Sequence, residues 1–321
     1  MKVKGFKHIY GPVPSRRLGR SLGVDLVPFK TCTYDCVYCQ LGRTTNNTLE
    51  RKEYVAIGAV MEELERKLAS GDIPDYISLA GSGEPTLNSG IGDLVRWIKK
   101  STKIPVAVLT NGSLLWMSEV QDALKPADLV LPSLDAGDEY IFQYVNRPHG
   151  NINFKQMTEG IAEFAGCFPG EVWLEVLLLA GVTGISSEVR KIADIVGRIR
   201  PARVQLNTVS RPPAEEFAYP LYENQMKELI NIIPGNVEII SDFKWHGRRA
   251  RFSFKTGDKD ILSLLGRRPC TSADVARGLG IHVTEALKHL EALIKAGEVE
   301  TVLVDEQTFY TVTGVTEVSR S

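Results

Sequence analysis

Short apolar runs alternate with amphipathic stretches along the first two-thirds of the chain. The apolar runs predict strands at residues 21–27, 76–80, 106–110, 129–133, 172–179, 204–208 and 237–240. The stretches between them repeat apolar residues at intervals of three or four and predict helices at residues 60–69, 91–99, 119–124, 154–164, 187–199 and 222–232. Such alternation favours repeated βα units around a parallel sheet, that is, an α/β fold.

The pattern changes near Arg248, where a basic segment predicts a linker over residues 246–257. Beyond it, apolar periodicity predicts three helices and then two β-like runs, at residues 258–266, 271–279, 283–296, 299–304 and 308–313. Three helices followed by a hairpin form the winged-helix arrangement. We therefore expect a core domain over residues 1–245 and a small α+β winged-helix domain over residues 258–316.

Composition is that of an ordinary globular protein, with 43% hydrophobic residues, 24% charged residues and a net charge of −1. The whole chain therefore gives no reason to expect a polyanion partner. Residues 1–60 are different, because they carry ten Lys and Arg against four acids. This excess indicates either a solvated face or an anion-binding mouth near the site.

Cysteine usage and the apolar runs bear on the compartment. Five cysteines, three of them within eight residues, do not suit a secreted disulfide framework. The first residues lack the apolar region of a signal peptide, and no run of about 18 apolar residues is present. We expect a cytoplasmic protein with no membrane partner.

The three grouped cysteines, Cys32, Cys36 and Cys39, follow a predicted strand with the spacing C-x3-C-x2-C. Thiolates are soft ligands that suit iron–sulfur clusters, and three of them can hold three irons of a cubane. The fourth iron then stays open to substrate. Structural zinc is the alternative, but it needs four closed ligands, and no His or fourth Cys lies beside the trio.

With Tyr38 before its last cysteine, the motif resembles that of the radical S-adenosylmethionine superfamily. The resemblance implies a [4Fe–4S] cluster on the three cysteines and a partial or full parallel (β/α) barrel. It also implies that S-adenosylmethionine chelates the open iron through its amino and carboxylate groups. One electron then gives a 5′-deoxyadenosyl radical, which abstracts a substrate hydrogen. An external donor of flavodoxin or ferredoxin type would supply that electron.

A glycine-rich turn after the second predicted strand, at residues 81–84, resembles the Gly-Gly-Glu motif with which this superfamily binds the methionine amino group. Ser82 departs from that motif, and an ordinary βα turn is the alternative. The resemblance implies cofactor contacts by Tyr38 and by the turn residues Gly81, Ser82, Gly83 and Glu84.

Polar residues at the ends of later strands are further candidates. Asn111 would lie on the rim above the cluster, and Ser133 and Asp135 share one face of an extended chain. We expect cofactor contacts from these three, with solvated turn residues as the alternative. Glu175 lies in an apolar run and must be paired or face a ligand if buried. Asn207 is placed similarly, so both are candidate substrate or catalytic residues, with structural polarity as the alternative.

Two segments, residues 10–25 and 146–149, are similar to the wyosine-synthetase-like branch, which acts, or is assumed to act, on a tRNA guanosine. In the first segment, Arg16 and Arg17 could bind an anionic substrate or form ion pairs within the fold. The true tRNA enzymes of the branch carry a second cluster on additional cysteines. Only Cys167 and Cys270 remain here, and we expect both to be ordinary buried thiols.

The winged helix suggests a nucleic-acid partner, but from Asp258 onward seven Lys and Arg stand against ten acids. Phosphate contacts dominate nucleic-acid affinity, so protein or peptide docking, or packing between domains, is favoured. The main hypothesis is a radical enzyme with an unidentified substrate. The alternatives are tRNA guanosine modification, peptide or protein modification with the winged helix as docking module, and a redox-sensing transcription regulator.

Overall fold

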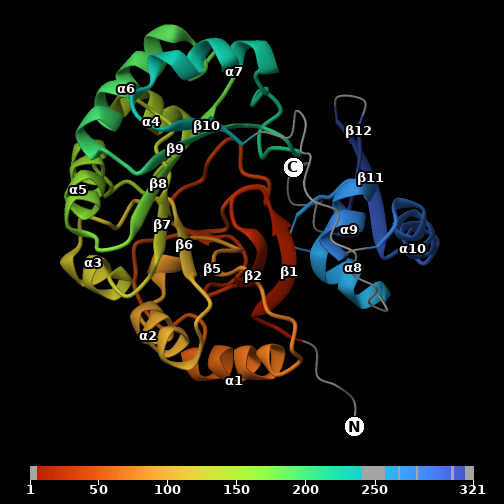
Figure 1. Ribbon diagram of the computed structural model, residues 1–321. Helices are drawn as coiled ribbons and strands as arrows, with labels where there is room; N and C mark the ends of the chain where they lie inside the picture. Colours follow the sequence, from red (N-terminus) through yellow and green to blue (C-terminus); the bar gives the residue numbers. More distant parts are fainter. Residues whose placement is uncertain (1–5, 241–256, 267, 280, 305–306, 315–321) are drawn as a thin grey trace.

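A curved sheet of eight strands runs through the larger part of the molecule, with helices along its outer side (Figure 1). The computed structural model describes residues 6–240, 257–266, 268–279, 281–304 and 307–314. In spatial order the strands are β1 (Ile9–Ser15), β2 (Gly19–Val24), β5 (Tyr76–Leu79), β6 (Val106–Thr110), β7 (Leu129–Pro132), β8 (Glu171–Leu178), β9 (Arg203–Thr208) and β10 (Val237–Ile239). Only the β1–β2 pair in this sheet is antiparallel. Because β1 and β10 end the order, the described strands form a partial barrel.

Helices connect the parallel strands and cover the sheet. They are α1 (Ile57–Leu68), α2 (Ile91–Ser101), α3 (Ser118–Leu124), α4 (Glu139–Val145), α5 (Phe154–Cys167), α6 (Ser186–Ile199) and α7 (Glu223–Leu229), with 3-10 turns η1 (Pro85–Leu87) and η2 (Ile230–Ile232). In α2, Ile91, Leu94, Val95 and Ile98 are fully buried at the spacing of one helix face. Among the described residues, none of the helices is both long and apolar enough to cross a membrane.

All seven predicted strands of the core are present. The apolar pattern misses β1, the two-residue strands β3 (Thr31–Cys32) and β4 (Asn46–Asn47), and helix α4. Strand β1 contains Gly11, Pro12 and Pro14, which read as turn residues but are tolerated at a sheet edge. Helix α4 is short and aromatic, so its periodicity is weak. Its start is set by Asp138, whose carboxylate accepts a hydrogen bond of 2.9 Å from Ile141 N.

The C-terminal part has the expected winged-helix arrangement. Its elements are α8 (Asp258–Leu265), α9 (Ser272–Leu279), α10 (Val283–Lys295) and the antiparallel hairpin of β11 (Val299–Val304) and β12 (Gln307–Val312). They enclose a core of their own that includes Ile261, Val275 and Leu290. Of the predicted linker, residues 246–256 lie outside the described residues, as do residues 241–245 and 315–316 at the predicted domain ends.

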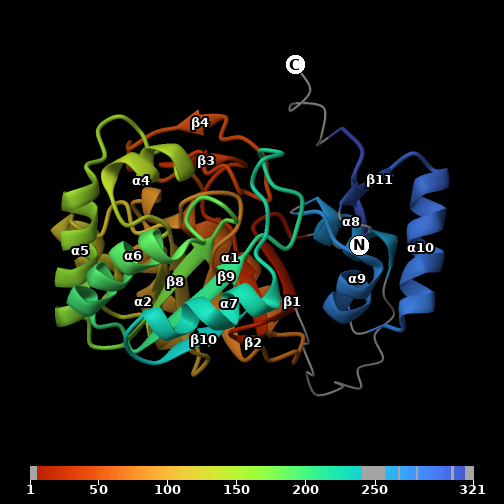
Figure 2. The same ribbon diagram turned by 90° about the horizontal axis from the view of Figure 1, so that it is seen from above.

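The winged helix packs against the edge of the sheet. Val13 of β1 contacts the apolar cluster of the C-terminal part, and α8 and α9 both contact β1. Figures 1 and 2 both show α10 on the side of this module away from the sheet. The edge strand that the sequence pattern misses is therefore the docking strand for the second domain.

Candidate functional site

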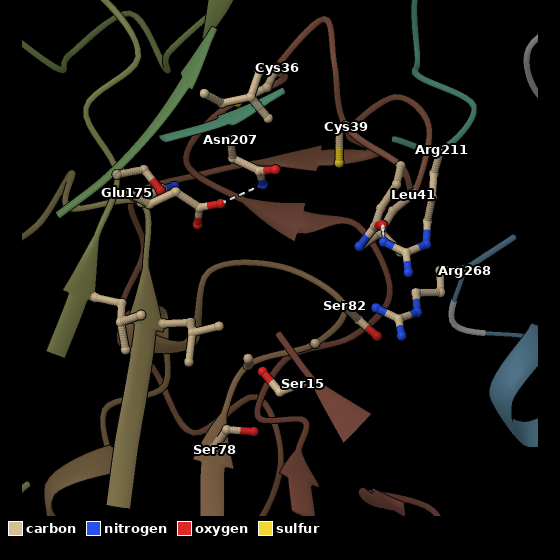
Figure 3. Close-up of a pocket in the computed structure, with 18 of the residues that line it drawn as sticks. Ser15, Cys36, Cys39, Leu41, Ser78, Ser82, Glu175, Asn207, Arg211 and Arg268 are labelled. Carbon is tan, nitrogen blue, oxygen red and sulfur yellow. Dashed lines mark hydrogen bonds between the residues drawn. The ribbon is translucent and has the colours of Figure 1, made fainter. Parts of the chain in front are cut away.

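A cavity of about 500 Å³ lies at the carboxyl ends of the parallel strands (Figure 3). All three grouped cysteines line it. So do most of the other residues singled out from the sequence: Arg16, Arg17, Tyr38, Gly81, Ser82, Gly83, Glu84, Asn111, Ser133, Glu175 and Asn207. Asp135 does not line it. Loops at the carboxyl ends of parallel strands build ligand sites in barrels of this kind, so the cavity is the candidate site.

The glycine-rich turn after β5 holds one side of the cysteine loop. Lys30 N donates to Ser82 O at 2.7 Å, and Glu84 N donates to Thr31 O at 3.1 Å. Gly83 is required at this contact, because a Cβ atom there would lie 1.8 Å from Thr31 O. The turn therefore fixes the position of the loop that carries the cysteines.

The segment after α4 holds the other side. Backbone hydrogen bonds of 2.8–3.1 Å join residues 33–37 to residues 145–149. This segment contains the Asn-Arg-Pro-His sequence that resembles the wyosine-type branch. In this structure its backbone has a positioning role, because it clamps the first half of the cysteine loop.

Each of the three cysteine sulfurs faces a nitrogen donor. The pairs are Asn111 Nδ2 with Cys32 Sγ at 3.6 Å, Asn146 Nδ2 with Cys36 Sγ at 3.5 Å, and Lys30 Nζ with Cys39 Sγ at 3.2 Å. One of these donors is a charged ammonium group. Such contacts favour the anionic, deprotonated form of sulfur, which is the form that binds metals.

Burial acts in the opposite direction and favours the protonated thiols. Burial and the nearby carboxylate of Glu84 together raise the pKa of Cys32 to about 12, although Lys30 works against the shift. Burial also raises the pKa of Cys36. Among the residues that the structure describes, no three His, Cys, Asp or Glu side chains are grouped to hold one metal ion. The case for a cluster therefore depends on the shared cavity, the three sulfurs and the donors that face them.

Glu84 is buried, and its carboxylate is hydrogen-bonded to other groups of the protein. It accepts hydrogen bonds from Thr86 N at 3.0 Å, Thr86 Oγ1 at 2.6 Å, Thr110 Oγ1 at 2.7 Å and Asn111 N at 2.7 Å. Burial nevertheless raises its pKa above the ordinary value. These bonds join the end of β5 to the end of β6, which is a role that the sequence did not indicate.

Asp135 does not line the cavity, but it contacts Tyr38, which does. Its carboxylate accepts hydrogen bonds from the Tyr38 hydroxyl, from Asn146 Nδ2 at 2.9 Å and from Leu177 N at 2.9 Å. Burial raises its pKa to about 6, although these hydrogen bonds act in the opposite direction. Asp135 therefore positions Tyr38 and Asn146, the partner of Cys36, while Ser133 two residues earlier lines the cavity.

Arg17 and Glu175 form a two-pronged ion pair, with both N–O distances at 2.7 Å. Asn207 Nδ2 donates to the same carboxylate at 2.9 Å. Burial would raise the pKa of Glu175, but the charge of Arg17 and these hydrogen bonds outweigh it and lower the pKa. For these three residues the structure shows pairing within the fold. Arg16 instead donates to Ile240 O at 3.1 Å and to Ser210 Oγ at 3.2 Å.

Several residues that line the cavity were not predicted as site residues from the sequence. They include Lys30, Tyr34, Arg211 and Arg268. The signal for Lys30 was its place two residues before Cys32, whereas Arg268 reaches the cavity only because the two domains pack together. Neither of the two remaining cysteines lines the cavity: Cys270 is buried as expected, but Cys167 is exposed at the end of α5, so the expectation of a buried thiol is wrong there.

Comparison with known proteins shows which families the two parts of the chain resemble. A family profile described as Radical SAM superfamily matches residues 26–195, and one described as Helix-turn-helix domain matches residues 259–302. The chain is 34% identical over 265 residues to a UPF0026 protein of Methanocaldococcus jannaschii, which covers 81% of this chain and 82% of the relative.

Two further similar proteins differ in how much of their length the chain covers. The chain is 38% identical over 307 residues to a protein named GTPase Obg from Brachyspira hyodysenteriae, covering 95% of this chain but only 45% of that protein. It thus spans less than half of that relative. A radical SAM methyltransferase from Sphaerobacter thermophilus shares the fold, with a TM-score of 0.52 and 18% identity over 68% of this chain and 66% of that one.

Proposed function

Since the chain belongs to the radical S-adenosylmethionine superfamily of enzymes, we propose that it binds a [4Fe–4S] cluster through Cys32, Cys36 and Cys39 and acts on S-adenosylmethionine. The bound cluster would supply one electron to cleave the sulfonium C–S bond, giving a 5′-deoxyadenosyl radical that abstracts a substrate hydrogen. The observation that carries the proposal is the single cavity lined by three sulfurs, each with its own nitrogen donor.

In this proposal, the nitrogen donors that face the three sulfurs stabilise the cluster and its reduced state. A thiolate-bound cluster is anionic, and hydrogen bonds to its sulfurs tune its reduction potential. Asn111 and Asn146 donate as neutral amides, whereas Lys30, a residue that is only 3% exposed, adds a buried positive charge. The three donors together favour binding and reduction of the cluster.

The cofactor would occupy the part of the cavity beside the glycine-rich turn. Gly81, Ser82 and Gly83 of that turn line the cavity, as do Tyr38, Asn111 and Ser133. The Glu84 carboxylate shapes the turn from inside. We therefore assign Glu84 and Asp135 to positioning these groups, and the others to contacts with the cofactor.

The electron and the substrate come from outside. The proposal includes an external one-electron donor of flavodoxin or ferredoxin type. The winged helix reaches the cavity with Leu264, Arg268 and Asp274, which supports a role on the substrate side of the same site. That placement favours substrate positioning over an independent nucleic-acid reader.

Anaerobic reconstitution with iron and sulfide tests the proposal. We expect about four irons per chain, and release of 5′-deoxyadenosine when dithionite and S-adenosylmethionine are added. Cys36→Ala should lose both. Cys167→Ser is the matched control, because that thiol is exposed and outside the cavity, and it should retain both. Well-reconstituted protein that releases no 5′-deoxyadenosine would contradict the proposed reaction.

A further inference from the structure

We propose that Arg211 and Arg268 form an oxyanion subsite, built jointly by the core and the winged helix, that holds a phosphate or carboxylate group of the substrate. Both line the cavity that contains the cysteines. Figure 3 shows Arg211 and Arg268 near each other on the side toward the winged helix, across the cavity from Glu175 and Asn207. The inference rests on the proposed function, because it takes the substrate to share this cavity with the cofactor.

Arg211, which follows β9, is the central member. Its side chain is only 10% exposed, and its Nε is buried without a hydrogen-bond partner among the described residues. Its other contacts are long: 3.4 Å to Gln40 Oε1 and 4.0 Å to Asp274 Oδ1. A buried guanidinium with an unused N–H costs free energy unless a ligand supplies the acceptor.

Arg268 brings a second positive charge to the same place. It lies between α8 and α9, and its side chain makes no hydrogen bond or ion pair within the part of the chain that the structure describes. Burial lowers the pKa of Arg211 to about 10, and the charge of Arg268 contributes to that shift. The two guanidinium groups, which lie near each other on one side of the cavity, therefore repel each other.

Asp274 is the carboxylate beside Arg211. Its Oδ1 lies 4.0 Å from the Arg211 guanidinium, and its Oδ2 accepts hydrogen bonds from Thr271 N at 3.1 Å and from Thr271 Oγ1 at 3.0 Å at the start of α9. Arg211 therefore has only a long contact with a carboxylate that also caps a helix.

The chemistry that fits is an oxyanion. The planar fork of arginine matches the oxygens of phosphate and carboxylate, and it binds either group through paired hydrogen bonds. An oxyanion between Arg211 and Arg268 would satisfy the unused Nε and remove the repulsion. Because Arg268 comes from the winged helix, the same contact would also couple substrate binding to the docking of that domain on β1.

The experiment is calorimetric titration of the full chain, before and after cluster reconstitution, with inorganic phosphate and separately with acetate at fixed ionic strength. We expect saturable binding of one or both anions. Arg268→Gln and Arg211→Gln should weaken it by about tenfold or more, which corresponds to one lost charge-assisted hydrogen bond. Arg198→Gln removes an exposed arginine of α6 and should leave the affinity unchanged.

Three outcomes would overturn the inference. The first is that neither anion binds, and the second is that Arg198→Gln weakens binding as much as Arg268→Gln. The third is that Arg268→Gln abolishes S-adenosylmethionine binding in equilibrium dialysis of reconstituted protein, because the subsite would then hold the cofactor. If Arg211→Gln does not fold, the anion affinity of Arg268→Gln, at a half-buried position, decides the test. The titration without cluster remains readable even if no 5′-deoxyadenosine forms, so the two proposals fail separately.

Discussion

The ammonium group of Lys30 lies 3.2 Å from Cys39 Sγ, inside a loop that buries it almost completely. Lys30 adopts a left-handed backbone conformation, with φ at 58°, and its N–H is bound to Ser82 O. The glycine-rich turn therefore places a positive charge on the one sulfur that no asparagine faces.

Replacing Lys30 with Met should make the cluster harder to reduce. Loss of the positive charge destabilises the more negative reduced state, so we expect the potential to fall by an amount on the order of tens of millivolts. Redox titration of reconstituted protein, followed by electron paramagnetic resonance, measures this. Lys30→Arg keeps the charge and the same backbone demand, and it should stay close to the wild type. Equal potentials in the two variants would contradict the assigned role.

Gly83→Ala should disturb the cysteine loop. The added Cβ would lie 1.8 Å from Thr31 O, one residue before Cys32, and backbone cannot move aside at low cost. We expect destabilisation of about 2 kcal/mol or more, together with a lower iron content after reconstitution. Gly58→Ala in α1 is the control, because no atom lies within 4 Å of its Cβ position. It should be neutral or stabilising by about 0.5 kcal/mol. Denaturant unfolding and iron analysis compare the two.

The sequence predicted the strands and helices that carry strong periodicity, and it failed where local and tertiary preferences disagree. Strand β1 reads as a turn because of its prolines, and it is stable only as an edge beside β2 and the winged helix. The cysteine spacing needs no tertiary information, so the trio could be found directly. The contact of Lys30 with Cys39 depends on the path of the whole loop.

Side-chain roles were harder to predict than positions. Glu84 was expected to contact the cofactor, and it does line the cavity. Its carboxylate, however, accepts hydrogen bonds from Thr110 and Asn111 at the end of β6, which are 26 and 27 residues further along the chain. Glu175 was recognised as needing a partner, and the sequence could not choose between Arg17 and a ligand. Arg211 and Arg268 become neighbours only through domain packing, for which no single segment carries a signal.

Breaking the ion pair between Arg17 and Glu175 should destabilise the fold in a pH-dependent way. The pKa of Glu175 is below its ordinary value of 4.5 in the folded protein. Its contribution to stability is therefore present above pH 4.5 and is lost as the pH falls through the lowered pKa. In Arg17→Met, burial acts without the opposing charge, so the pKa of Glu175 should rise and the penalty should be largest at neutral pH.

We expect Arg17→Met to cost about 3 kcal/mol at pH 7, since one partner of a buried pair is left uncompensated. The deficit should shrink as the pH is lowered toward 4.5 and the carboxyl group becomes protonated. Arg17→Met combined with Glu175→Gln should recover part of the loss at pH 7. Urea unfolding of the chain without cluster at several pH values measures this, and a deficit that does not change with pH would contradict the assignment.

Val13→Asp should loosen the winged helix from the core. Val13 packs against the apolar cluster of the C-terminal domain from strand β1, and a carboxylate at that contact would have to be buried or hydrated. Either outcome removes about 1.5 kcal/mol or more of apolar burial from a small interface. Hydrogen exchange should then become faster in α9, which contacts β1, while β11 and β12 keep their protection. Leu303→Asp, on an exposed position of β11, should leave hydrogen exchange in α9 unchanged.

Arg268 reaches the cavity only when the domains are packed, so Val13→Asp should also weaken phosphate binding. Unchanged phosphate binding together with faster exchange in α9 would show that the oxyanion subsite does not depend on domain docking.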